Sequence, residues 1–529
     1  MSLPLQHDDT IIIPMRSGVR RKFILGVSTY VFLILSIILC FSLIIMYAKN
    51  SHDPGLADFL DFAGSDYGYN GQISSIRKIY FPQLKDQTYL DYTAAGIPTS
   101  TVASHARRTL SNQIFTNPHS GSQRHVIEEQ RKFVSDFFNA KDYEFVFTSG
   151  TTNSLELIAR DFSLKMCQFS RFFYSIDNHL SVLGMRSYFN NSNWQGLEFN
   201  SLLDSVLKRN EFLYRNELLN VENMIVIPAQ SNFDGTVFDY HDLFQRIEKD
   251  CLEKGVKKWT FVLDAAAYVS THSLDLNTHN YIDYIPLSFY KIIGYPTGVG
   301  GFFVRKTLLP TFERGYFGGG SVVLALPEND VIIERGNDVQ RIETGTVSFT
   351  DIQFLTTAFD LINTLGMDVI EKHVQSLVKW TVEKMTSLTH QNGQPLIKIY
   401  GPHSPKRGST IAFSILDDTG HVISPSTVSS KAALAGVLFR TGSMCNHGAF
   451  MSNLGISEEE LLKYITAGCE CVPDFCRHFD VSANDSGDPC LPDFLDGGQP
   501  NAVHRISFGY PSSYQDVVAF LKFLEIFSG

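Results

Sequence analysis

The sequence predicts an α/β protein with a large domain built on a mostly parallel sheet, a smaller α+β C-terminal domain, and one transmembrane helix ahead of both. Three observations lead to this prediction. Short apolar runs alternate with longer amphipathic stretches, a continuous helical pattern follows them, and a second group of strands and helices closes the chain. Alternating strands and helices are typical of a parallel sheet that helices cover on both faces.

The large domain is predicted at residues 79–380. Its strand candidates are EFVFTSG (144–150), NMIVIPAQ (223–230), WTFVLDAAA (259–267) and GGFFVRK (300–306), and its helix candidates are TTNSLELIARDFSL (151–164) and HDLFQRIEKDCLEKG (241–255). Residues 357–389 carry apolar side chains at three- and four-residue spacing throughout, which predicts a long connecting helical region. The small domain is predicted at residues 381–529, because a new set of candidates begins there. These are the strands IKIYG (397–401) and STIAFSIL (409–416) and the helices LKYITAG (462–468) and QDVVAFLKFLEIFS (515–528).

Residues 23–48 contain no charged side chain and are long enough, as a helix, to cross a hydrocarbon core of about 30 Å. They predict an uncleaved, single-pass signal anchor, because the apolar region of a cleaved signal peptide is normally shorter. The basic residues of the preceding tail, 1–22, place the N-terminus in the cytosol. Residues 49–78 are rich in Gly, Asp and Ser and are interpreted as a juxtamembrane linker. N-glycosylation sequons at Asn190 and Asn484 are compatible with a catalytic part on the noncytosolic side of the membrane. The side on which the catalytic part lies is left open.

The composition excludes several classes of function. A formal charge of -11 argues against a nucleic-acid partner, because phosphate binding requires a basic face. Eight cysteines in 529 residues are too few for a disulfide scaffold. Four of them crowd near the C-terminus, but their spacing matches no paired zinc motif, so no metal site is predicted. These four are Cys469, Cys471, Cys476 and Cys490.

Three segments suggest a cofactor site, although each has an alternative interpretation. Residues 148–152 (TSGTT) lie between a predicted strand and a helix, where they could bind a phosphate or only cap the helix. Asp264 ends the run WTFVL at the edge of the sheet where ligands usually bind, or it forms a turn. Lys291 follows the run DYIPLSFY, or it extends its ammonium group to solvent. A lysine, an acid and a phosphate site are what pyridoxal 5'-phosphate (PLP) requires.

A collinear set of motifs from Tyr89 onward removes much of this ambiguity. The set resembles the NifS-like domain of molybdenum cofactor sulfurases, within the class V aminotransferase and cysteine desulfurase family, and implies a type I PLP-dependent transferase fold. The motifs are YLDYTAAG, TNPHS, FVFTSGTTNSLELIA, YSIDNHLSVLGMR, IPAQSNFDG, LDAAAYVSTHSLDL, PLSFYKIIGYPTGVGG, YFGGGSV, ETGTVSF, RTGSMCNHGA and HRISFGY.

The resemblance implies a role in cofactor binding for eight residues. Lys291 would hold PLP as a Schiff base, Asp264 would pair with the pyridine nitrogen, and His179 would stack on the ring. The remaining five are Thr151, Thr152 and Ser288 for the phosphate, Asn232 for the phenolic oxygen, and Thr346 for the phosphate of a neighbouring subunit in a homodimer.

The resemblance also implies a reaction. Arg505 matches the arginine that binds the substrate carboxylate, and Cys445 matches the cysteine that takes sulfur from L-cysteine as a persulfide while alanine is released. Without the family, Arg505 could be a surface arginine and Cys445 an inert buried thiol. Two further alternatives are a PLP-dependent aminotransferase or lyase acting on another amino acid, and a noncatalytic membrane-bound adaptor of the same fold.

The sequence departs from this family in three features. Molybdenum cofactor sulfurases usually continue into a C-terminal MOSC domain, which this sequence does not contain, and a membrane span is not part of their usual plan. Their cysteine loop often carries CFC, whereas Ser443 stands here in place of the first cysteine. The sulfur acceptor, and any involvement of molybdenum cofactor, are therefore left open.

Overall fold

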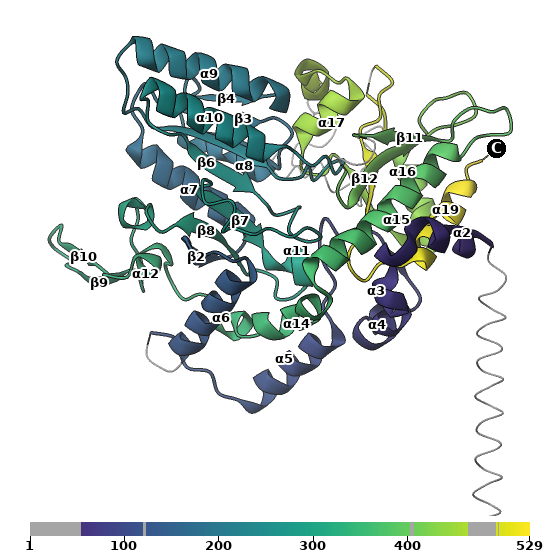
Figure 1. Ribbon diagram of the computed structural model, residues 1–529, viewed down its shortest axis with the longest axis horizontal. Coiled ribbons are helices and arrows are strands. Elements are labelled where there is room, and N and C mark those ends of the chain that lie inside the picture. Colours follow the sequence, from purple (N-terminus) through teal and green to yellow (C-terminus); the bar gives the residue numbers. More distant parts are fainter. Residues whose placement is uncertain (1–53, 120–122, 403–406, 464–492, 496, 529) are drawn as a thin grey trace, which may run out of the picture. The chain divides into compact units, whose positions relative to one another are not determined.

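The computed structural model describes residues 54–119, 123–402, 407–463, 493–495 and 497–528. The chain divides after Phe62 into two units. The described residues of the first unit form most of helix α2 (Pro54–Ala63). The second unit contains all the sheets found in the described residues (Figure 1). Within the described residues no helix has both the length and the apolar character to span a membrane, and the predicted anchor, residues 23–48, lies outside them.

The larger sheet has seven strands in the order β2-β8-β7-β6-β5-β3-β4. All neighbouring pairs are parallel except those of β8, which is antiparallel to both β2 and β7. The predicted mostly parallel sheet is therefore confirmed. Its strands are β2 (Tyr143–Thr148), β3 (Arg171–Ser175), β4 (Trp194–Leu197), β5 (Asn223–Pro228), β6 (Thr260–Asp264), β7 (Tyr284–Ser288) and β8 (Gly300–Arg305).

Helices cover both faces of this sheet. Phe261 of β6 stacks on Phe244 of α10 with ring centroids 4.4 Å apart, whereas the next residue, Val262, packs in the same apolar cluster as Leu155 and Ile158 of α7. Because successive strand residues point to opposite faces, α7 and α10 lie on opposite sides. The helices in this part of the chain are α5 (Ser100–Asn112), α6 (Gln123–Phe137), α7 (Thr151–Lys165), α8 (Leu180–Gly184), α9 (Phe199–Arg215), α10 (Tyr240–Lys254), α11 (Phe289–Ile293), α12 (Asp338–Ile342), α13 (Phe349–Ile352) and α14 (Leu355–Leu365).

The carboxyl ends of β2 and β7 meet at one edge of the sheet. Gly300 of β8 pairs with both Thr148 and Ser288. A Cβ on Gly300 would lie 2.6 Å from the carbonyl oxygen of Leu287 and 2.7 Å from the Cα of Gly150, so only glycine allows the three strand ends to approach this closely. The loops that follow these strands carry the candidate site.

A second, antiparallel sheet has the order β11-β12-β15-β14, and β1 pairs with β13 in a separate parallel ladder. A hairpin of β9 and β10 stands apart from both (Figure 1). The strands are β1 (Thr88–Tyr89), β9 (Val322–Ala325), β10 (Ile332–Glu334), β11 (Ile397–Tyr400), β12 (Thr410–Ile415), β13 (Val437–Leu438), β14 (Arg440–Gly442) and β15 (Val503–Ser507). The remaining helices are α3 (Gly68–Gly71), α4 (Ile73–Tyr80), α15 (Met367–Ser387), α16 (Pro425–Ala435), α17 (His447–Leu454) and α19 (Tyr514–Glu525).

The structure corrects the predicted linker. From residue 63 onward this segment is folded, with Tyr69, Ile73 and Ile76 buried and Arg77 paired with Asp516 at 2.7 Å. Ile73 and Ile76 are three positions apart on α4 and therefore lie on one face of that helix, whereas Tyr69 lies before it with a left-handed backbone. The Gly, Asp and Ser content obscured this short repeat, so the folded body begins before residue 79.

Two predicted boundaries also shift. The helical region divides at Gly366 (φ +82°) into α14 and α15, because a glycine, which has no Cβ, adopts a positive φ without a steric cost. Helix α15 then crosses the predicted domain boundary at residue 380. Most of the predicted helix 462–468, and the four C-terminal cysteines, lie outside the described residues.

His373 attaches the early segment to the C-terminal part of the fold. The backbone N–H of Gly68 donates to its Nδ1 (3.0 Å), and its Nε2 donates to the carbonyl of Ser512 (2.9 Å). Its ring packs on Tyr67 and Tyr69 with centroids 5.1 and 4.4 Å away. Burial lowers the pKa of His373 to about 4, so the folded protein keeps this imidazole neutral.

This histidine should make stability depend on pH. Since its pKa is lower in the folded than in the unfolded chain, the unfolded chain binds the proton first, and stability is lost as pH falls through about 6.5 toward 4. His373→Phe keeps an aromatic ring but removes the titration. Between pH 7 and pH 5, urea denaturation should show the parent losing about 2 kcal/mol more of its free energy of unfolding than this variant. Equal losses would contradict the assignment.

Candidate active site

The segment TSGTT, which is predicted to bind a phosphate, forms the turn where β2 passes into α7. The Thr151 N–H donates to Ser288 Oγ (2.9 Å), and the hydroxyls of Thr151 and Ser288 are 2.8 Å apart. Gly150 has φ +142°, and a Cβ there would lie 3.1 Å from Ser288 Oγ. Free N–H groups at a helix N-terminus attract anions. Thr152 lies at the rim, with its hydroxyl 2.7 Å from that of Ser181.

Lys291 and Asp264 form the charged centre of the site. Asp264 ends β6, is buried, and accepts one backbone hydrogen bond from Ala266 (3.0 Å). Lys291 lies on α11, the short helix that follows β7. Burial lowers the pKa of Lys291, and the nearby Asp264 charge opposes that shift. Burial likewise raises the pKa of Asp264, against the effect of Lys291. An amine with a lowered pKa is more often neutral, as an attack on an aldehyde requires.

His179 lies at the start of α8, where its imidazole caps the helix. Its Nδ1 accepts from the Ser181 N–H (3.1 Å) and lies 3.0 Å from the Ser181 hydroxyl. Burial, with a smaller contribution from the Lys291 charge, lowers the pKa of His179 to about 3. The ring is therefore neutral near pH 7, which suits stacking on an aromatic cofactor.

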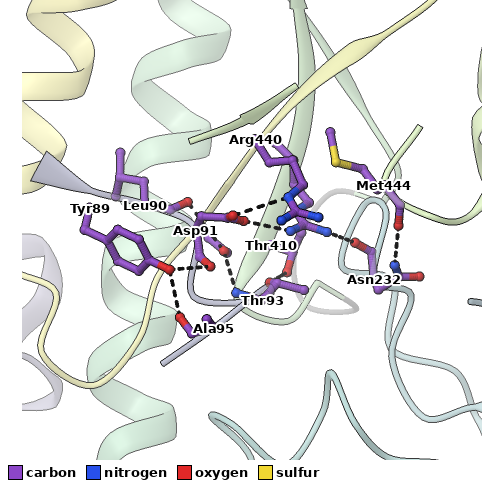
Figure 2. A network of polar contacts seen from close by, with 11 residues as sticks. Tyr89, Leu90, Asp91, Thr93, Ala95, Asn232, Thr410, Arg440 and Met444 are labelled. Carbon is purple, nitrogen blue, oxygen red and sulfur yellow. Dashed lines mark hydrogen bonds and ion pairs between the residues drawn. The ribbon is translucent and has the colours of Figure 1, made fainter. Parts of the chain in front are cut away.

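Arg505 is buried on β15 and contacts residues far away in the sequence. Its Nη2 donates to Asp91 (2.7 Å) and its Nη1 to the carbonyl of Asn232 (2.7 Å). Arg440 reaches the second oxygen of Asp91 at 3.3 Å, so one carboxylate bridges two arginines (Figure 2). Among the described residues, Arg505 Nε is buried without an acceptor. A buried guanidinium N–H that lacks a partner is suited to a carboxylate ligand.

Cys445 lies in the turn between β14 and α17, which we call the Cys445 turn (residues 443–446). The thiol is half-buried. Both Met444 (φ +60°) and Cys445 (φ +53°) are left-handed, which is uncommon for residues with a Cβ and costs free energy at each. The Cys445 carbonyl accepts from the N–H of Leu180, the residue after His179. The turn therefore lies beside the residue predicted to stack on PLP.

Asn232 and Thr346, both predicted to contact the cofactor, make other contacts in the structure. The side chain of Asn232 donates to the Met444 carbonyl (2.7 Å) and accepts from Asn446 (3.0 Å), and Figure 2 shows it facing Met444. One Nδ2 proton remains, so the contact with the phenolic oxygen stays a prediction. Thr346 is exposed, with Asn117 Nδ2 3.5 Å from its hydroxyl. Its hydroxyl is not part of the Thr151–Ser288 hydrogen-bonded pair. Its contact with the cofactor phosphate of a second subunit also stays a prediction.

The sequence analysis missed four polar residues that organise the site. Asp91 and Arg440 surround Arg505, while Asp177 and Asn446 support the Cys445 turn. Each lies inside a motif already singled out. The sequence signal for each was a charged or amide side chain close in sequence to a predicted site residue. The sequence alone does not show which distant residue such a side chain contacts.

The residues fit PLP on structural grounds. The hydroxyls of Thr151 and Ser288 converge at a helix N-terminus, the buried Asp264 carboxylate needs a cationic or N–H partner, and Lys291 lies close enough to perturb its pKa. An acidic partner for the pyridine nitrogen, a lysine amine for the aldehyde and donors for the phosphate are the groups that this cofactor needs. The fold and the site together define a PLP-dependent enzyme of the α/β class.

Comparison with known proteins identifies the family. The model of the class-V aminotransferases matches residues 88–520. The chain belongs to this family, and PLP is its cofactor.

Individual relatives narrow the comparison. Molybdenum cofactor sulfurase of Homo sapiens is 34% identical over 87% of this chain, and that of Solanum lycopersicum is 31% identical over 88%. The aligned part amounts to 52% and 59% of those proteins, so the chain spans about half the length of the curated relatives that it matches. The apo structure of the cysteine desulfurase from Thermococcus onnurineus NA1 shares the fold, with a TM-score of 0.64 at 21% identity, covering 86% of this chain and 98% of that one.

Proposed function

We propose that the chain is a PLP-dependent sulfurtransferase that moves sulfur from L-cysteine to Cys445 as a persulfide and releases alanine. The observation that carries this proposal is that the turn bearing Cys445 is hydrogen-bonded directly to the residue that follows His179. A thiol held beside a cofactor ring is placed to attack a substrate attached there. The similarity to molybdenum cofactor sulfurases supports the same reaction.

Each residue of the site has a separate role in the proposed reaction. PLP, when bound, supplies an electron sink for charge that develops at the substrate Cα. Arg505 binds the carboxylate of L-cysteine, and the neutral amine of Lys291 takes the Cα proton. The Cys445 thiolate attacks the substrate Sγ, so that an S–S bond forms as the C–S bond breaks. The electron pair of that bond stays with the carbon fragment, which takes up a proton at Cβ, receives the Cα proton back from Lys291 and leaves as alanine.

A direct assay tests this proposal. The purified full chain, loaded with PLP and supplied with L-cysteine and a reducing thiol, should form alanine. Formation of pyruvate instead would favour a lyase reaction, and release of a keto acid with transfer of the amino group would favour an aminotransferase. PLP binding with turnover of neither L-cysteine nor another amino acid would overturn the enzymatic assignment.

Arg505 should control substrate binding. Arg505→Lys keeps the charge but loses the planar pair of donors, so KM for L-cysteine should rise about tenfold to a hundredfold, as expected for the loss of one or two charge-assisted hydrogen bonds. The visible absorbance of bound PLP should be unchanged. The matched control is Arg440→Lys, which also contacts Asp91 and should change KM much less. An equal effect of both variants would remove the specific role of Arg505.

The proposal includes a homodimer. Hairpin β9–β10 exposes apolar side chains on both of its strands, including Val323 (67% exposed) and Ile333 (50% exposed). Contiguous exposed apolar groups are typical of surfaces that a partner covers. Thr346 lies in the segment that follows this hairpin and is exposed, as a residue serving a second subunit would be. Light scattering of the purified chain measures this directly, and a monomeric mass at micromolar concentration would contradict it.

We also propose that residues 23–48 anchor the chain in a membrane with the N-terminus in the cytosol. The support is their length and the lack of charge. Asn190 is exposed in the structure and so is accessible for glycosylation. Sensitivity of the full chain to an N-glycosidase would place the catalytic part outside the cytosol, whereas cleavage by protease only from the cytosolic side would place it within.

A further inference from the structure

The Cys445 turn adopts a backbone conformation that needs external support. Met444 and Cys445 are consecutive non-glycine residues with φ of +60° and +53°. An L-residue in this region has a close contact between its Cβ and its backbone. Two such residues in succession persist only where the surroundings determine them.

Elements of the larger sheet hold both strained residues. Asn232 Nδ2, from the loop after β5, donates to the Met444 carbonyl (2.7 Å). The Leu180 N–H, at the start of α8, donates to the Cys445 carbonyl (2.8 Å). The carbonyls of both left-handed residues therefore bond to segments beside the larger sheet, whereas the strand that leads into the turn, β14, belongs to the smaller sheet.

Asn446 is the centre of these contacts. It is fully buried, and its Nδ2 donates to Asp177 Oδ1 (2.7 Å) and to Asn232 Oδ1 (3.0 Å). Its Oδ1 accepts from the N–H of Asn178 (3.2 Å) and from the N–H of Ala449 (3.1 Å), where it caps α17. A side-chain amide has two donor protons and two acceptor lone pairs, so all four are used.

Asp177 fixes the orientation of that amide. Its Oδ1 accepts from Asn446 and also from the Ser231 hydroxyl (2.8 Å). Burial and the neighbouring charge of Asp234 raise its pKa to about 7. Burying a carboxyl group costs free energy, and the two hydrogen bonds to Asp177 Oδ1 offset part of that cost. It lies two residues before His179, so the same segment positions the stacking ring and the turn.

We propose that Asn446, oriented by Asp177, is a positioning residue that holds the Cys445 turn against the larger sheet, and that loss of their hydrogen bond releases the thiol from the site. This inference rests on the proposed function only where it assigns Cys445 a role in sulfur transfer. In the held state Cys445 lies beside His179 for attack on the substrate sulfur. In the released state it is accessible to an external acceptor.

Four variants of the PLP-loaded full chain test this inference. Asn446→Asp keeps the oxygen that caps α17 but replaces both side-chain donations by repulsion with Asp177. Asp177→Ala removes the acceptor, and Asp177→Asn retains a carbonyl oxygen for it. Asn453→Ala is the matched control, because this asparagine also lies on α17 but, among the described residues, its side chain bonds only within that helix, to the carbonyl of Ala449 (2.9 Å).

The readout is the rate at which iodoacetamide alkylates Cys445 without substrate, followed on the Cys445 peptide by mass spectrometry. Asn446→Asp and Asp177→Ala should raise this rate about tenfold, corresponding to the loss of about 1.4 kcal/mol from the held state. Asp177→Asn and Asn453→Ala should match the parent. Visible PLP absorbance in each variant establishes that the site is folded, and if one of the first two variants lacks it, the other decides.

Turnover supplies a second readout. The kcat of alanine formation should fall about tenfold in Asn446→Asp, with Asp177→Asn close to the parent. Alkylation rates equal to the parent in Asn446→Asp and Asp177→Ala would overturn the inference, as would an equal rise in Asn453→Ala. Alkylation of Cys445 does not depend on enzymatic turnover. A parent that forms no alanine would therefore contradict the proposed function, while the alkylation rates would still test whether Asn446 and Asp177 hold the Cys445 turn.

Discussion

Lys291→Ala is expected to abolish the visible absorbance of enzyme-bound PLP and to reduce alanine formation about a thousandfold or more. The lysine has two tasks, as the attachment point of the aldehyde and as the base at the substrate Cα, and positioned bases alone contribute about a hundredfold to ten-thousandfold. The lowered pKa of its amine, caused by burial, fits both tasks. Absorbance spectra after dialysis against PLP, with an alanine assay on the same samples, measure both effects.

The control for this prediction is Lys306→Ala, because that lysine is exposed and follows the end of β8 opposite to Gly300. It should bind PLP and turn over as the parent does. If Lys291→Ala retained the absorbance of covalently bound PLP, another amine would be the attachment point, and the assignment of α11 as the cofactor helix would be wrong.

Cys445→Ser is expected to leave the PLP absorbance intact while alanine formation falls to background. Serine fits the space of cysteine, so the left-handed turn and its hydrogen bonds should persist, but a hydroxyl group is a poor nucleophile toward sulfur compared with a thiolate. The effect should appear in kcat rather than in KM for L-cysteine, because Arg505 is unchanged. Cys167→Ser is the matched control, since Cys167 is an exposed free thiol.

A different result would assign sulfur transfer elsewhere. Alanine formation at the parental rate by Cys445→Ser would remove this thiol from the reaction. Loss of activity in Cys167→Ser as well would point to general sensitivity of the assay to thiols rather than to a single nucleophile.

The sheet and its functional edge could be predicted because local sequence encodes them. The runs at 223–230 and 259–267 have consecutive apolar residues in their middle (MIVIP and FVL), which is typical of strands buried on both faces, and both became strands. Asp264, at the end of one run, therefore had to lie at the carboxyl edge. Thr151 and Lys291 likewise follow strands β2 and β7, as the sequence predicts.

Other features depend on contacts between distant residues and could not be predicted. Asp91 meets Arg505 across 414 positions, and Asp177 meets Asn446 across 269. No periodicity connects such pairs, because only the folded sheets bring them together. The folded segment that begins at residue 63 was missed for a different reason, since its apolar repeat is too short to outweigh its loop-like composition.

The most direct measurement of the central claim is mass spectrometry of the Cys445 peptide after the PLP-loaded chain is mixed with L-cysteine and quenched with an alkylating agent under nonreducing conditions. The account predicts a Cys445 peptide heavier than the alkylated thiol by one sulfur atom, formed together with alanine and absent in Lys291→Ala. A peptide without added sulfur while alanine accumulates, or added sulfur only on other cysteines, would contradict it.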